Sequence, residues 1–180
     1  MKVNPFRILF SISTILRITL PLAIFRFPLF VIIAVTFLDD IDGDIASQGV
    51  FSKSRYQFID KLIDNWWYLC VLVYSYFALN NFFVFLLALF IYRIVGLWLF
   101  LSSKKRHLLI FFPNFFENAF FLFFFVNYFG WQILITGSNL YYSLIVVFIL
   151  KLLQEYWLHV LKKSFVEDVF KFKWRKWLPE

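Results

Sequence analysis

The chain of 180 residues alternates long apolar stretches with short polar connections. A helix needs about 20 predominantly apolar residues to cross the hydrocarbon core of a bilayer. Stretches of about that length occur six times, at 6–25, 28–46, 60–79, 81–102, 108–129 and 139–160. The connections between them leave little chain for a soluble domain. The pattern therefore predicts an all-α integral membrane protein, with one domain of six transmembrane helices over residues 1–180.

The composition supports this prediction. Hydrophobic residues make up 62% of the chain, which contains 28 Phe, and a water-soluble domain does not have this composition. The first apolar stretch is not expected to be a secretory signal, because Arg7 and Arg17 interrupt it and no small-residue cleavage site follows. Cys70 is the only cysteine, which excludes a disulfide within the chain.

The positions of the basic residues predict the orientation. With the N-terminus in the cytoplasm, Arg26 is the only basic residue in the outside connections. The inside segments carry all the other loop and terminal cations: Lys2, Arg7, Lys53, Arg55, Lys104, Lys105, Arg106 and the tail from 162 to 176. Cytoplasmic segments are enriched in Lys and Arg, so both termini are expected to be cytoplasmic. The tail 162–180 alternates basic and aromatic residues, which favours an anchor on anionic lipid over a nucleic-acid site.

Four acidic residues lie where the second and third apolar stretches end and begin. Asp39 and Asp42 are three residues apart, and Asp60 and Asp64 are four apart, so each pair shares one face of a helix. The predicted topology brings both pairs to the cytoplasmic side at the same depth. An uncompensated Asp inside a membrane helix costs about 2.5–3.5 kcal/mol, so these carboxylates require a specific role.

A metal site is the chemistry that these carboxylates favour. Two divalent cations would neutralise their four negative charges, and ligation by oxygen alone is typical of magnesium or manganese. Two metal ions about 4 Å apart can hold a diphosphate from both sides. For the neighbouring Asp40 and Asp44, solvation at a helix end is an equally good interpretation.

The segment from Asp39 to Asp64 resembles the signature of the CDP-alcohol phosphatidyltransferase family, D-x2-D-G-x2-A-R-x8-G-x3-D-x3-D. Every interval of the signature is kept, and so are its four Asp, its first Gly and its Ala. Ser47 stands where the signature has Arg, and Tyr56 stands where it has the second Gly. The six helices of the family and its cytoplasmic-face site agree with the predicted topology.

The resemblance implies an enzyme of phospholipid biosynthesis. Such an enzyme transfers a phosphatidyl or related phospho-alcohol group from a CDP-linked donor, such as CDP-diacylglycerol, to an alcohol and releases CMP. By the resemblance, Asp39, Asp42 and Asp60 hold two Mg²⁺ or Mn²⁺ ions, while Asp64 acts as general base and also contacts the second metal. The residues expected beside the nucleotide are Gly43, Ala46, Ser47 and Tyr56. The family likeness also suggests a homodimer.

Other cations are candidates for phosphate or acceptor contacts. Thr14 to Arg17 matches a T-x-x-R pattern of the family's first helix, and Arg17, Lys53 or Arg55 could replace the missing Arg. Arg93 has two interpretations: an ion pair with Glu117, or a phosphate ligand in the acceptor cavity. The absence of a Lys-Thr motif between 104 and 117 argues against glycerol 3-phosphate as the acceptor.

Two other functions compete with the enzyme. A catalytically silent relative would keep the fold as a lipid-binding or partner-binding protein, which Ser47 and Tyr56 favour and the four Asp oppose. A cation transporter would also use intramembrane carboxylates. Transporters place their sites near the bilayer midplane between repeats, whereas this acidic cluster lies near one face and the chain has no internal repeat.

Overall fold

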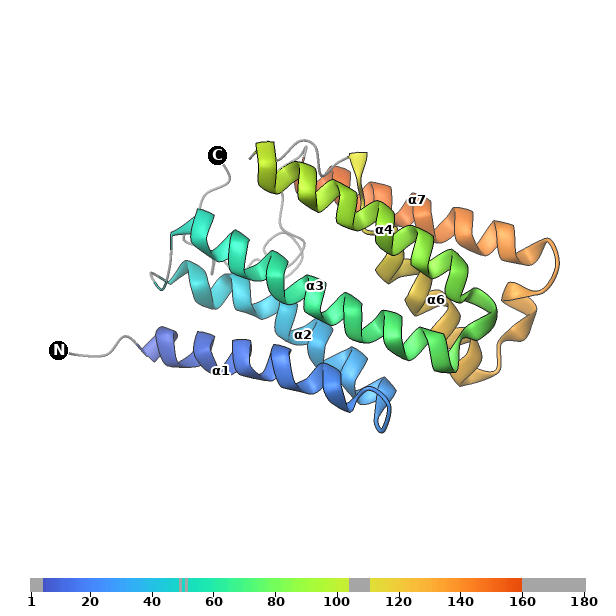
Figure 1. Cartoon of the computed structure of the whole chain (residues 1–180), viewed down its shortest axis with the longest axis horizontal. Helices are drawn as coiled ribbons and strands as arrows, with labels where there is room; N and C mark the ends of the chain where they lie inside the picture. Colours follow the sequence, from blue (N-terminus) through green and yellow to red (C-terminus); the bar gives the residue numbers. More distant parts are fainter. Residues whose placement is uncertain (1–4, 49, 51, 104–110, 160–180) are drawn as a thin grey trace. The chain divides into compact units, whose positions relative to one another are not determined.

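The computed structural model describes residues 5–48, 50, 52–103 and 111–159, and it describes side chains for all of these except 53, 155 and 157–159. This part of the chain is entirely helical, which confirms the predicted all-α class. Its six α-helices and two 3-10 helices are shown in Figure 1. They are α1 (Pro5–Thr19), η1 (Leu20–Ala23), α2 (Pro28–Ser47), α3 (Lys53–Ala78), α4 (Asn80–Ser103), α6 (Phe115–Phe129), η2 (Gln132–Ile135) and α7 (Asn139–His159).

Three helix ends differ from the hydropathy prediction. The chain changes from α1 to the 3-10 helix η1 at Leu20, because Pro21 lacks an N–H group and its ring is incompatible with a continuing α-helix. Helix α3 begins at Lys53, seven residues before the predicted start at 60. Helix α6 begins at Phe115, where the Asn114 side chain accepts a hydrogen bond from the Glu117 N–H and caps the helix.

Within the part of the chain that the structure describes, two helical segments are long and apolar enough to cross a membrane, Pro5–Ala23 and Asn80–Ser103. Buried core helices of soluble proteins and signal sequences meet the same criterion of length and composition. Helix α6 has 15 residues, fewer than the roughly 20 that span the hydrocarbon core. The predicted number of six spans therefore stays a prediction.

The described residues fall into two compact units, and the chain passes from one to the other within α3, between Tyr74 and Ser75. In the first unit, α1 and α2 run side by side in opposite directions (Figure 1). Phe10 of α1 packs in an apolar cluster with Ala46 and Val50, and its ring meets the Tyr56 ring edge-on. These contacts place the start of α3 beside the antiparallel helix pair.

A hydrogen bond also connects α3 with α1. The Trp66 indole N–H donates to the carbonyl of Ile18 over 2.9 Å. Ile18 is close to the end of α1, so its carbonyl is among those that lack a partner within the helix.

The second unit contains α4, α6 and α7. Phe82 of α4 stacks on Phe123 of α6 with ring centroids 4.0 Å apart. Phenylalanines, together with one Ala and one Val, form the buried face of α6. Their three- and four-residue spacing places them on one stripe of the helix: Phe116, Ala119, Phe120, Phe123, Phe124 and Val126. The prediction that both units form one domain is neither supported nor opposed by this division.

Gly96 allows a close approach within the second unit. A Cβ atom at this position would overlap with Cβ and Cγ of Phe112. The same neighbour accepts a hydrogen bond of 2.7 Å through its carbonyl from Arg93, one turn earlier on α4. Gly96 and Arg93 together hold the segment before α6 against α4.

We expect Gly96→Ala to destabilise the protein, because the added methyl group forces Phe112 to move, at a packing cost of about 1–3 kcal/mol. This cost exceeds the roughly 1 kcal/mol by which Ala favours a helix over Gly. Denaturant unfolding of the purified protein in detergent measures the change. Val95→Ala, at a neighbouring half-exposed side chain, is the control and should cost less. Unchanged or increased stability of Gly96→Ala would contradict the close packing.

Candidate active site

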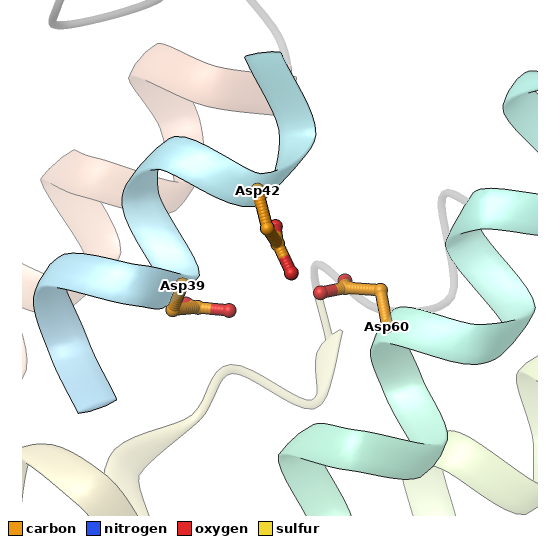
Figure 2. A group of neighbouring side chains, drawn as sticks. All are labelled: Asp39, Asp42 and Asp60. Atoms are coloured by element: carbon orange, nitrogen blue, oxygen red, sulfur yellow. The ribbon is translucent and has the colours of Figure 1, made fainter. Parts of the chain in front are cut away.

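The C-terminal half of α2 and the N-terminal half of α3 bring carboxylates together in the first unit. Asp39, Asp42 and Asp60 point toward one another across the space between the two helices (Figure 2). One oxygen of each lies within 4.8 Å of the others. Asp42 is buried, whereas the Asp39 side chain is 48% exposed, so the cluster is open on the Asp39 side. The helical spacing in the sequence predicted this convergence.

Arg17 of α1 lies at the centre of the carboxylates. Its Nη1 atom donates to Asp42 Oδ2 and, over 3.3 Å, to Asp60 Oδ1. Its Nη2 atom donates to Asp39 Oδ1 at 2.5 Å and to Asp64 Oδ1 at 2.7 Å. Each terminal nitrogen thus bridges one carboxylate of α2 and one of α3. The side chain is 2% exposed, so this guanidinium is a buried counter-ion shared by four acids.

Lys61 is a second counter-ion that was not predicted from the sequence. Its Nζ atom donates to Asp60 Oδ2 at 2.8 Å and to Asp64 Oδ2 at 2.6 Å. The sequence did contain a signal, because Lys61 follows Asp60 directly and precedes Asp64 by three residues, a spacing that pairs side chains on a helix. Arg17 and Lys61 leave the four carboxylates with a formal net charge of −2.

Tyr56 also belongs to the cluster. Its hydroxyl donates to Asp42 Oδ1 over 2.6 Å and lies 3.5 Å from Asp60 Oδ1. Burial raises the pKa of the Tyr56 phenol well above its ordinary value, and the negative charges of Asp60 and Asp42 raise it further. The phenol therefore keeps its proton and acts as a donor to the carboxylates. The predicted contact of Tyr56 with a nucleotide stays a prediction.

The other residues expected beside the nucleotide lie along α2. Gly43, Ala46 and Ser47 are all buried. The Ser47 hydroxyl donates to the backbone carbonyl of Asp44 over 2.6 Å. A hydroxyl in this position does not provide the charged, bidentate hydrogen-bond donor for a phosphate that the Arg of the signature would supply.

The remaining predicted cations lie in different places. Arg55 is exposed in the first turn of α3, and the side chain of Lys53 is outside the described residues, as is the basic tail from 162 to 180. Arg93 belongs to the second unit, where it donates to the Phe112 carbonyl. Glu117 accepts from the Asn114 side-chain amide over 2.7 Å. Within the described contacts, neither Arg93 nor Glu117 uses the other as its partner.

The donor set fits a hard divalent cation. Asp39, Asp42 and Asp60 offer oxygen ligands within a radius that one ion could bridge, and oxygen-only ligation suits Mg²⁺ or Mn²⁺. Both carboxylate oxygens of Asp42 and of Asp60 already accept bonds from Arg17, Lys61 or Tyr56. A cation that binds these oxygens must therefore compete with Arg17 and Lys61.

This competition leads to a prediction for Arg17→Gln. Loss of the guanidinium leaves several buried carboxylates without their shared counter-ion, so we expect a loss of stability of about 3 kcal/mol or more in the presence of a chelator. Manganese should then restore stability more strongly in the variant than in the wild type, because Lys61 is the only competing cation that remains among the described contacts. Thermal unfolding in detergent with EDTA or Mn²⁺ measures both effects. If the variant loses as much stability with manganese as without it, the two cations do not share these oxygens.

The chain matches no protein-family model, no curated protein and no solved structure. What the site does is therefore inferred from its own residues and their spacing.

Proposed function

We propose that the protein is a membrane-bound, metal-dependent transferase of the CDP-alcohol phosphatidyltransferase type. It transfers a phosphatidyl or related phospho-alcohol group from a CDP-linked donor to the hydroxyl of an alcohol and releases CMP. The observation that carries this proposal is the convergence of Asp39, Asp42 and Asp60, at the spacing of the signature, on one point with their oxygens within 4.8 Å of one another.

Each acid has a role in the proposed reaction. Asp39, Asp42 and Asp60 would hold two Mg²⁺ or Mn²⁺ ions. Asp64 would in addition contact the second ion. Such ions, when bound, screen the charge of a diphosphate and stabilise the CMP leaving group. Because Asp39 is half exposed while Asp42 is buried, the donor would approach from the Asp39 side.

Asp64 is the proposed general base. It lies one turn after Asp60 on α3, and Arg17 and Lys61 orient its two oxygens. The acceptor hydroxyl would give its proton to Asp64, and its oxygen would form a bond to the phosphorus of the phosphatidyl group. The phosphoanhydride bond to CMP breaks in the same reaction. A base in this role must come within about 3 Å of the hydroxyl.

Exposed apolar side chains support a location in a membrane. On α1 and α7 they form faces that a bilayer would cover: Ile8, Leu9, Ile12, Ile15 and Leu16 on α1, and Ile145, Val146, Ile149, Leu150 and Leu153 on α7. The proposed arrangement has six spans, cytoplasmic termini and the active site at the cytoplasmic face, as the distribution of basic residues in the sequence favours. A homodimer remains part of this proposal.

The test is release of CMP from CDP-diacylglycerol by the purified protein in detergent with Mn²⁺. Polar alcohols are added one at a time, with inositol, serine and glycerol 3-phosphate among them. We expect release that depends on both the metal and one acceptor, and that EDTA abolishes. A folded protein that releases no CMP with any acceptor would refute the transferase function.

A silent relative is the second candidate, and a specific observation favours it. Arg17 and Lys61 already neutralise half of the formal charge of the four acids, and Tyr56 donates to Asp42. This network also connects α1 with α2 and α3, so the same residues could have a purely structural role. In that case the protein would bind lipid or a partner and would neither require manganese nor release CMP.

A further inference from the structure

Two hydroxyl groups of α1 are buried about one turn before Arg17, whose guanidinium lies in the acidic cluster. Ser13 is 4% exposed, and its Oγ atom makes no hydrogen bond to any described residue. The Oγ1 atom of Thr14 is likewise buried without a hydrogen-bond partner among the described residues. A buried hydroxyl without a partner is unfavourable, so two adjacent ones suggest that something else binds them.

Other hydroxyls in the same helix behave differently. Ser11 donates to the carbonyl of Arg7, and Thr19 donates to the carbonyl of Ile15, both over 2.9 Å. This bond to the carbonyl four residues earlier is the usual solution for Ser and Thr in a helix. Ser11 and Thr19 are exposed, whereas Ser13 is on the buried face. The hydroxyls of Ser13 and Thr14 therefore stay available as donors among the described residues.

Their neighbours along α1 define where they lie. Phe10 packs on Ala46 and Val50, and Arg17, two turns later, bonds Asp42 and Asp39. Ser13 and Thr14 lie between these two contacts.

Because α1 and α2 are antiparallel (Figure 1), the stretch of α1 from Phe10 to Arg17 lies opposite the stretch of α2 from Ala46 to Asp42. That part of α2 contains Gly43 and Ala46, whose small side chains allow another group to come close to the helix backbone. The turn of α1 that carries the two hydroxyls thus precedes Arg17 and lies opposite the small residues of α2.

This part of α1 also offers free hydrogen-bond donors for a phosphate, which the Ser47 hydroxyl does not. The hydroxyl of Ser47 donates to a backbone carbonyl of its own helix. In contrast, Arg17, one turn after Ser13 and Thr14 on α1, has a buried donor at Nε that, like their hydroxyls, has no partner among the described residues. Phosphate oxygens accept strong hydrogen bonds from hydroxyl and guanidinium donors.

We infer that Ser13 and Thr14, with Arg17 Nε, form a phosphate subsite that binds the phosphate of the CMP group of the donor. It takes the place of the Arg that the signature has at position 47. This assignment rests on the proposed transferase function and names the part of the site that holds the nucleotide phosphate. Ser13 and Thr14 are neutral donors, so their removal should weaken the binding of the phosphate without changing the charge of the metal site.

The test compares two double variants of the full-length protein in detergent with saturating Mn²⁺. Ser13→Ala with Thr14→Val removes the proposed donors, and Ser11→Ala with Thr19→Val removes two exposed hydroxyls of the same helix as the matched control. Binding of CMP and of cytidine, which lacks the phosphate, is measured by calorimetry. The first variant should bind CMP at least about tenfold more weakly, because it loses hydrogen bonds to a charged group. Its affinities for cytidine and for manganese should equal those of the wild type, as should all affinities of the control.

The possible results distinguish this subsite from the function on which it rests. If the wild type binds CMP and the first variant binds it equally well, the subsite is wrong and the transferase proposal stands. Equal losses for CMP and cytidine would also overturn the subsite, because they indicate a structural role. If the wild type does not bind CMP with manganese, both proposals fail. Should the double variant not fold, Ser13→Ala alone, which removes one oxygen, is expected to show the same selective loss for CMP.

Discussion

Asp64→Asn is expected to lower the rate of CMP release by about 10²–10⁴-fold while leaving manganese-dependent CMP binding largely intact. That range is the usual contribution of a general base. An amide cannot accept the proton of the acceptor hydroxyl, yet it has nearly the shape of the carboxylate. Asp39, Asp42 and Asp60 still offer their three ligand oxygens in the variant.

Turnover and binding must be measured on the same preparation of this variant. CMP release from CDP-diacylglycerol gives the rate, and a manganese-dependent thermal shift with CMP gives the binding. Asp40→Asn is the matched control, because it makes the same chemical change at an exposed residue of α2. If Asp64→Asn lost binding and turnover equally in a folded protein, or kept its turnover, Asp64 would not be the base.

Asp42→Asn should abolish both turnover and manganese-dependent CMP binding. Asp42 is the most buried of the three clustered acids, with 1% exposure, and its two oxygens accept from Tyr56 and Arg17. Even residues that only support a metal ligand typically contribute about 10–100-fold to metal affinity. Loss of a ligand should therefore cost more than that.

The measurement for Asp42→Asn is the thermal unfolding temperature with Mn²⁺, with and without CMP. A ligand that binds the folded state raises this temperature in proportion to the logarithm of its concentration over its Kd. The wild type and Asp40→Asn should show the rise, and Asp42→Asn should not. A full rise in Asp42→Asn would show that CMP binds without the acidic cluster.

The acidic cluster was predictable because helix geometry links sequence spacing to direction. Residues three or four apart lie on one face, so the positions of Asp39, Asp42, Asp60 and Asp64 predicted convergence as soon as α2 and α3 were neighbours. The structure brings the same four residues around Arg17. The sequence predicted only that Arg17 of the first helix could reach this site. Its ion pairs with all four carboxylates were not predictable, because a contact between helices far apart in the chain has no local sequence signal.

The helix ends were less predictable than the acidic cluster. As a consequence, Tyr56 was not expected to be part of α3. Hydropathy reports how apolar a stretch is, whereas a helix continues as long as its backbone bonds and caps permit. The polar start of α3 from Lys53 was therefore missed, although it is helical. Tyr56 belongs to this start, and its hydroxyl points to Asp42 and Asp60 as part of α3. Asn114 likewise determines the start of α6 through its cap.

The acceptor alcohol could not be predicted for a different reason. Side chains from several helices jointly shape an acceptor cavity, and the sequence does not specify which of them meet. Arg93 illustrates this, because the sequence suggested either an ion pair with Glu117 or a phosphate contact, whereas its described bond is to the backbone carbonyl of Phe112.

A manganese-binding isotherm of the wild-type protein in detergent, recorded with and without CMP, tests the central claim most directly. The account predicts two Mn²⁺ ions per chain, bound more tightly when CMP is present, and loss of this binding in Asp42→Asn. Absence of manganese binding at millimolar concentrations in a folded protein would contradict it. The four acids, Arg17 and Lys61 would then be a structural ion network that joins α1 to α2 and α3.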